Sequence, residues 1–230
     1  MQLSKRLLAV SEMVTSNSRL ADIGTDHAYI PIYLVENQRV PHAIAMDVNK
    51  GPLNRAKENI ELHGLKEYIE TRLSDGAAAL RNGEVDSVVI AGMGGGLVIK
   101  ILTEGSDVLE SVKELILQPQ SELAFVRRFL QENQFAVIEE NMVLDEGKYY
   151  PMMKAVHGKM DYNREIDFKY GRLLLEQKNE CLKYFLDKEE KTYEKVLLTL
   201  RGNDGDHAKQ RFAEVEQELE YIRRAKEDMA

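Results

Sequence analysis

The sequence of 230 residues contains a single cysteine, no long apolar run and no excess of positive charge. Cys181 alone forms no internal disulfide and no cysteine metal site, and a buried or half-buried helix position explains it better than a reactive thiol. No apolar run approaches the roughly 18 residues that span a bilayer. The apolar stretch near the N-terminus is too short for a signal peptide, and Glu12 interrupts it. We therefore expect a cytoplasmic protein, with no membrane and no metal among its partners.

The charge balance limits the ways in which the chain can bind nucleic acid. The net charge is −8, with 17 basic against 22 acidic residues over 1–160 and 14 against 17 over 161–230. Proteins that bind nucleic acid usually present a basic face to the phosphates. Neither part of the chain is basic as a whole, so any RNA would be held by a local patch.

Short β-rich runs alternate with helical patterns over the first 157 residues. The alternation predicts βαβ units in a mostly parallel, seven-stranded sheet, whereas the turn 145–148 joins the last two strands as a hairpin. The expected strands are 19–24, 42–48, 68–74, 86–93, 114–120, 135–144 and 149–156. The expected helices are an amphipathic N-terminal segment, 29–37, 49–64, a short 76–83, 95–105 and 121–133. The fold class is therefore α/β, with a Rossmann-like domain over 1–158.

The last part of the chain has a different pattern. Apolar residues at three- and four-residue steps predict a long helix over 162–200 and a second over 207–228. The polar, glycine-bearing segment 201–206 separates them. We expect an antiparallel helical hairpin, similar to a coiled coil, as a second domain over 159–230.

The first strand ends in the motif DIGTD, which contains Asp22, Gly24 and Asp26. The carboxyl ends of strands in an open α/β sheet bind ligands, and glycine allows a close backbone approach. Asp26 occupies the place of the second glycine of a GxGxxG motif, where its charge would repel a pyrophosphate. S-adenosylmethionine (SAM) has no phosphate and carries an ammonium and a sulfonium, so it suits an acidic loop. A turn that only connects strand and helix is the alternative.

The next two strand ends also carry acids. Asp47 lies 25 residues after Asp22, where a carboxylate can accept both hydroxyls of a ribose. A helix cap is the alternative for Asp47, although Asn49 is the better cap. Asp75 and Gly76 end the third strand, where an adenine amine can be bound, but by themselves they indicate only a turn.

The fourth strand ends in a glycine-rich turn, AGMGGG, that includes Gly92. No Lys-Ser or Lys-Thr follows it, which excludes a P-loop. Close approach of the backbone to the methionine end of a ligand, or to a flat substrate, is the more natural interpretation. The four motifs in order predict a site for an adenosine-containing ligand with a cationic tail.

Together, DIGTDHAYIP, AMDV, LSDG and AGMGG resemble the bacterial tRNA (adenine-22-N1)-methyltransferases, and the resemblance covers essentially the whole chain. It implies a class I methyltransferase domain followed by a helical coiled-coil domain, with SAM as cofactor and tRNA as partner. The implied reaction is methylation of N1 of an adenine in the D-arm region. The expected cofactor contacts are Asp22, Gly24, His27, Asp47, Val48, Asp75, Gly76, Gly92 and Met93.

The catalytic candidates lie in the loop after the first strand. Enzymes that methylate exocyclic amines often have Asn/Asp-Pro-Pro-aromatic after the fourth strand, and this chain has Ala91–Gly94 there. Adenine N1 has an in-plane lone pair, so it needs placement and desolvation more than a base. Asp26 is expected to stabilise developing positive charge. His27 and Tyr29 are candidates for stacking on the target base or hydrogen bonding to it, with purely structural roles as the alternative.

The candidate RNA contacts are basic residues at several places in the chain. The segment 151–175, with five basic and three acidic residues, is the best patch, although solvated surface charge is the alternative for each. The candidates are Lys5, Arg6, Lys154, Lys159, Arg164, Lys169 and Arg172, with Arg127, Arg128 and Lys148 in addition. The helical hairpin either binds tRNA, mediates dimerisation, or only supports the first domain, and we expect a monomer or a weak homodimer.

Three other functions are compatible with parts of this pattern. A SAM-dependent enzyme acting on a small molecule or a protein would have the same pocket. A SAM-binding or nucleotide-binding module without catalysis would use the helical hairpin as its working surface. A nicotinamide oxidoreductase is disfavoured by Asp26 and by the lack of GxGxxG.

Overall fold

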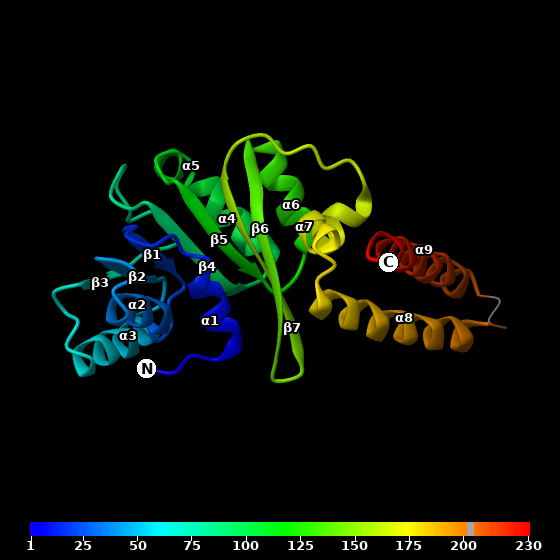
Figure 1. Cartoon of the computed structure of the whole chain (residues 1–230), viewed down its shortest axis with the longest axis horizontal. Coiled ribbons are helices and arrows are strands. Elements are labelled where there is room, and N and C mark those ends of the chain that lie inside the picture. The colour runs from blue at the N-terminus through cyan, green and yellow to red at the C-terminus, as the bar shows by residue number, and fades with distance from the viewer. Residues whose placement is uncertain (202–204) are drawn as a thin grey trace. The chain divides into compact units, whose positions relative to one another are not determined.

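The computed structural model describes residues 1–201 and 205–230, which divide into two compact units, Met1–Asp161 and Tyr162–Ala230. The first unit contains a sheet with helices, and the second contains helices (Figure 1). Residues 202–204, within the segment expected to separate the two C-terminal helices, lie outside the described residues.

The sheet of the first unit has seven strands in the order β3-β2-β1-β4-β5-β7-β6. All neighbours are parallel except β7, which runs antiparallel to both β5 and β6. The strands are β1 (Leu20–Ile23), β2 (Ala43–Asp47), β3 (Ile69–Leu73), β4 (Ser87–Met93), β5 (Glu114–Pro119), β6 (Phe135–Asp145) and β7 (Lys148–His157). The expected Rossmann-like sheet with a terminal hairpin is confirmed.

Helices cover both faces of this sheet. Side chains of α1, α2 and α3 form one core with residues such as Val89 and Ile116 of the central strands. Val88 and Ile90 are also buried, and they point to the opposite face because side chains alternate along a strand. There, α4 packs on β4 and β5, and α6 packs on α4 and β6. The helices are α1 (Lys5–Glu12), α2 (Tyr29–Glu36), α3 (Lys50–Leu62), α4 (Gly95–Glu104), α5 (Ser106–Leu109) and α6 (Leu123–Glu132).

The short helix expected over 76–83 is wrong, because turns occupy this segment. The side chain of Ser74 explains the difference. Its hydroxyl donates to the carbonyl of Gly76 (2.9 Å) and accepts from the amide of Ala79 (3.1 Å). A serine that bonds to nearby backbone groups offers them an alternative to a helix.

The single helix expected over 162–200 is also wrong. The second unit instead contains η1 (Asp167–Gly171), α7 (Arg172–Glu176) and α8 (Glu180–Leu200), followed by α9 (Asp206–Asp228). Gly171 and Lys178 have φ values of 92° and 51°, which a continuous right-handed helix does not allow. Asn179 then caps α8, accepting from the amide of Leu182 (3.0 Å).

The antiparallel pairing of α8 and α9 is as expected. Lys226, near the end of α9, pairs with Asp187 (2.6 Å) and Glu190 (2.7 Å) in the first half of α8.

Cys181 is half-buried in α8, and burial raises the pKa of its thiol, so the thiol stays protonated. None of the helices in the described residues is both long enough and apolar enough to cross a membrane.

Candidate active site

A cavity of about 280 Å³ lies at the carboxyl ends of β1 and β4. It brings together six residues predicted from the strand-end motifs with residues of α1 and of the segment after β5. The lining residues are Arg6, Leu7, Asp22, Gly24, Thr25, Asp26, His27, Tyr29, Ile30, Ala91, Gly92 and Gln120. The cavity and these predicted residues thus lie at the carboxyl edge of the sheet, where open α/β sheets bind ligands.

Asp22 is the buried acid of this cavity, with only 4% of its surface exposed. Its Oδ2 accepts a hydrogen bond from the hydroxyl of Thr25 (2.6 Å). Burial raises the pKa of Asp22 to about 6, the Thr25 hydrogen bond opposes this rise, and the charge of Asp47 adds to it. A buried carboxylate whose negative charge is poorly compensated by its neighbours is suited to bind a cationic ligand group.

Gly24 follows β1 at a position that only glycine fills easily. Its φ is +80°, and an added Cβ would lie 2.1 Å from Cε of Met93. The Met93 side chain therefore covers the Gly24 backbone. This close approach couples the end of β1 to the end of β4, so the motifs of the two strands form one wall.

The loop between β1 and α2 is held in a strained conformation. Asp26 and Ala28 have φ values of 46° and 56°, which cost about 1–2 kcal/mol each for residues other than glycine. Two side chains of α3 hold the loop: Arg55 Nη2 donates to Asp26 Oδ1 (2.8 Å), and Asn59 Nδ2 donates to the His27 carbonyl (3.0 Å). The backbone around His27 is thus fixed before any ligand binds.

The side chains of His27 and Tyr29 stack on one another at this cavity. Their ring centroids are 5.0 Å apart and the planes differ by 7°. His27 Nε2 also lies 3.6 Å from Oδ2 of Asp26. The pair presents a preformed aromatic surface of the kind on which a nucleobase stacks.

Gly92 forms an irregularity at the end of β4. The register with β5 shifts between Ala91 and Met93, and the φ of Gly92 is +81°. A bulge of this kind re-aims the backbone, here toward the cavity. The next glycines do not face a ligand in the same way, because Gly96 N donates to the carboxylate of Glu122 (2.7 Å).

The remaining five predicted cofactor residues do not line this cavity, and one of them is Met93, whose side chain covers Gly24. Asp47, Val48, Asp75 and Gly76 are at the ends of β2 and β3, which follow β1 in the sheet. The Asp47 carbonyl accepts from the amide of Ser74, and Asp47 Oδ1 accepts from the amide of Asn49 (2.7 Å). Asn49 is the N-cap residue of α3, so Asp47 is not the helix cap, and its contact with the Asn49 amide uses one of its two oxygens. Val48 is 57% exposed and the Asp75 side chain 64% exposed.

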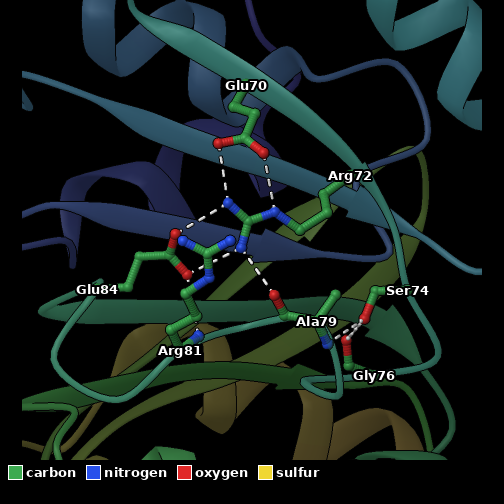
Figure 2. A network of polar contacts seen from close by, with 7 residues as sticks. All are labelled: Glu70, Arg72, Ser74, Gly76, Ala79, Arg81 and Glu84. Atoms are coloured by element: carbon green, nitrogen blue, oxygen red, sulfur yellow. Dashed lines mark hydrogen bonds and ion pairs between the residues drawn. The ribbon is translucent and has the colours of Figure 1, made fainter.

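An ion-pair network fixes the segment that carries Asp75 and Gly76 (Figure 2). Arg72 on β3 donates to Glu70 and to Glu84, each at 2.8 Å, and to the carbonyl of Ala79. The hydrogen bonds from Arg72 lower the pKa of the Glu84 carboxyl. The chain after β3 is therefore held against the edge strand, so the strand end keeps its position.

The structure changes the interpretation of several predicted RNA contacts in the first unit. Lys154 is not a surface residue: its side chain is 12% exposed, and its ammonium lies 2.8 Å from Glu114. Arg127 is fully buried and pairs with Glu140. The expectation that these two cations face the surface is corrected. Lys5 and Lys159 are exposed, as that expectation requires.

The three predicted RNA contacts of the second unit form ion pairs within that unit. Arg164 pairs with Asp167 and Asp228, each at 2.5 Å, Lys169 pairs with Glu218 (2.8 Å), and Arg172 pairs with Glu176 (2.9 Å). Their charges are thus largely balanced by neighbouring acids. In the folded protein, acidic neighbours therefore balance much of the positive charge that the sequence places in segment 151–175.

Two lining residues near the strand ends have polar side chains that the sequence motifs did not identify. Thr25 follows Gly24 and bonds to Asp22, and Gln120 follows β5. The signal for Gln120 was its place as the last residue of the fifth expected strand, 114–120. Arg6 also lines the cavity, although it was expected among the RNA contacts. Among the residues that the structure describes, no three His, Cys, Asp or Glu side chains are grouped to hold a metal ion.

A sheet of this order, with acids and glycines along the carboxyl ends of adjacent strands, defines the chain as a class I SAM-dependent methyltransferase. Two solved structures of the same architecture contain the cofactor or its product. Streptococcus pneumoniae Sp1610 in complex with S-adenosyl-L-methionine is 34% identical, has a TM-score of 0.87, and aligns over 97% of this chain and 99% of its own. M. capricolum TrmK in complex with S-adenosyl-homocysteine is 28% identical, with a TM-score of 0.86 and complete coverage of both chains.

The comparison with protein families identifies the same class of enzyme. The profile of tRNA (adenine(22)-N(1))-methyltransferases, TrmK, matches residues 20–224. The chain is 33% identical over 229 residues to the tRNA (adenine(22)-N(1))-methyltransferase of Bacillus subtilis strain 168, across 97% of this chain and 96% of the relative. The chain belongs to the tRNA (adenine(22)-N(1))-methyltransferase family, and the resemblance expected from its motifs is confirmed.

Proposed function

We propose that this chain methylates N1 of adenine 22 in tRNA, with SAM as the methyl donor, and that the acidic edge of its sheet positions that donor. The observation that carries the proposal is the row formed by Asp22, Asp47 and Asp75 at the ends of three adjacent strands. Neighbouring strands are about 4.8 Å apart, so the strand ends from β3 to β4 extend over about 14 Å. A nucleoside with an amino-acid tail extends over a similar length.

Each part of the donor has a matching group in this row. Asp47 accepts the ribose hydroxyls, mainly through the oxygen that does not bond to Asn49. Asp75 and Gly76 bind the adenine edge, and the exposed side chain of Val48 packs on the adenine ring. The methionine end lies in the cavity with Asp22, against the backbone surfaces of Gly24 and Gly92 and beside Met93.

The residues of the β1–α2 loop place the target base. When bound, SAM supplies an electrophilic methyl group on its sulfonium. Tyr29 and His27 stack on the adenine so that its N1 lone pair points along the line of the sulfur–methyl bond. The new N1–carbon bond forms as the sulfur–carbon bond breaks, which leaves a thioether and a cationic base. The Asp26 carboxylate, already shared with Arg55, stabilises that charge.

We further propose that residues 1–158 carry SAM binding and catalysis and that residues 159–230 hold the folded tRNA. The exposed Lys5 and Lys159 supply phosphate contacts, and Arg164, Lys169 and Arg172 exchange acidic partners for phosphates. The enzyme works in the cytoplasm as a monomer or a weak homodimer. An adenine paired within tRNA must leave its stack to reach the cavity.

Transfer of labelled methyl from SAM to unmodified tRNA transcripts, followed by nucleoside analysis, tests the proposal. Wild-type protein is expected to produce 1-methyladenosine, and a transcript with guanine at position 22 should stay unlabelled. Asp47→Ala should abolish the transfer, whereas Glu67→Ala, which removes an exposed acid before β3, should not. Label in the guanine-22 transcript would refute the assigned position. No label in any tRNA, despite SAM binding, would refute the tRNA assignment.

A further inference from the structure

The guanidinium of Arg6 lines the cavity although its residue belongs to α1, far from the strand-end motifs in sequence. Three contacts orient the residue. Its amide donates to Asp145 Oδ2 (3.0 Å), its Nη1 donates to the buried Gln118 (3.1 Å), and its guanidinium carbon lies 5.4 Å from the centre of the Tyr150 ring. The side chain is thus held by neutral groups in one position at the cavity wall.

The charge of Arg6 is not neutralised by the protein. Within residues 1–201 and 205–230, no carboxylate forms an ion pair with its guanidinium. Arg72 and Lys154, which are similarly shielded, each pair with glutamate. A half-buried arginine with neutral partners, in a chain of net charge −8, keeps its capacity to bind an anion.

Arg6 lies next to the methionine part of the proposed SAM site. A Cβ added to Gly92 would be 3.3 Å from Arg6 Nη1, so the guanidinium lies against the backbone at the end of β4. Asp22 and Gly24 line the same cavity of about 280 Å³. One guanidinium and the buried Asp22 match the carboxylate and the ammonium of a zwitterionic amino-acid group.

We propose that Arg6 binds the α-carboxylate of the SAM methionine moiety, while Asp22 receives its ammonium; this assignment rests on the proposed function of the cavity. A carboxylate is favoured over an RNA phosphate because the guanidinium shares the cavity with Asp22, whose charge would oppose a phosphodiester. Arg6 is therefore a cofactor-binding residue supplied by the N-terminal helix.

Calorimetric titration with two ligands tests the assignment. The ligands are SAM and decarboxylated SAM, which keeps the amine and sulfonium but lacks the carboxylate. Arg6→Gln should weaken SAM binding about 10- to 100-fold, the range for hydrogen bonds to a charged group. The same variant should bind decarboxylated SAM within about twofold of wild type. Wild type should itself prefer SAM, and Arg6→Lys should recover part of that preference.

Controls separate this proposal from a folding defect and from the proposed function. Arg81→Gln removes an exposed arginine on the segment before β4, and it should leave the affinity for both ligands unchanged. Equal losses for the two ligands in Arg6→Gln would refute a carboxylate contact. Unchanged SAM affinity with a raised KM for tRNA would assign Arg6 to a phosphate instead. If wild type binds SAM with the expected preference but methylates no tRNA, the proposed substrate fails while the Arg6 assignment stands.

Discussion

Asp22→Asn removes a charge that the fold accommodates poorly, so we expect the ligand-free variant to be more stable than wild type. Burial raises the pKa of Asp22 from 3.8 to about 6, despite the Thr25 hydrogen bond. Since the folded-state pKa lies above the unfolded value, the ionised carboxylate disfavours folding. The penalty develops as pH rises from about 4 to about 6 and is constant above that. At pH 7.5 it corresponds to about 3 kcal/mol.

Urea unfolding of the ligand-free proteins measures this difference. The variant should gain up to about 3 kcal/mol at pH 7.5 and only about 1 kcal/mol at pH 4.5, where the folded wild type is already protonated. The asparagine oxygen can still accept from Thr25. Asp75→Asn, a change of the same chemistry at an exposed strand end, should alter stability at neither pH. A gain that is absent, or equal at both pH values, would refute the reasoning.

SAM should reverse the order of stability. Wild type gains RT ln(1 + [L]/Kd) from the ligand, and the variant, lacking the acid for the ammonium, gains much less. The affinity of wild type for SAM should fall as pH drops through about 6, because protonated Asp22 cannot balance a cation. The affinity of Asp22→Asn should not change over the same range. Equal stabilisation of both proteins by SAM would show that Asp22 does not contact the ligand.

Three further predictions concern single residues. Asp47→Asn should weaken SAM binding about 10- to 100-fold by calorimetry, with an unchanged melting temperature because an amide oxygen can still accept from Asn49. Gly24→Ala should destabilise the protein by about 1–2 kcal/mol through its positive φ, measured by urea unfolding; adding Met93→Ala should relieve the steric clash but not this cost. Glu140→Ala should cost about 3–5 kcal/mol in the same assay, because it leaves a buried guanidinium without its carboxylate.

The sheet could be predicted from sequence because its signals are local. Most of the parallel strands are short apolar runs, and the ends of β1, β2 and β4 are marked by an acid or a glycine. The segment 76–83 is the exception, since a serine side chain competes for the backbone there. The break in the second unit was also encoded locally, by Gly171 and by the cap at Asn179, but apolar spacing on both sides of it suggested one helix.

The surroundings of individual charges could not be predicted in the same way. Arg127 and Arg128 are adjacent in sequence, but Arg127 is fully buried and pairs with Glu140 on β6, whereas Arg128 is only half-buried. Lys154 faces Glu114 because β7 inserts between β5 and β6. Arg6 reaches the cavity because α1 packs on β5 and β6, which brings its guanidinium beside Gly92 at the end of β4. Each placement depends on contacts between segments far apart in the chain, which composition and periodicity do not contain.

Two poorly compensated charges and one strained loop of the first unit lie around a single cavity, and this supports one ligand for that cavity. Asp22 is buried with a raised pKa, Arg6 lacks an acidic partner among the described residues, and Asp26 and Ala28 have left-handed backbones. Elsewhere in this unit, shielded cations such as Arg72 pair with acids. Backbone strain and poorly compensated charges are expected around a cavity when ligand binding offsets their free-energy cost. A ligand carrying both an ammonium and a carboxylate relieves the Asp22 and Arg6 charges at once, whereas a purely anionic or purely cationic ligand relieves only one.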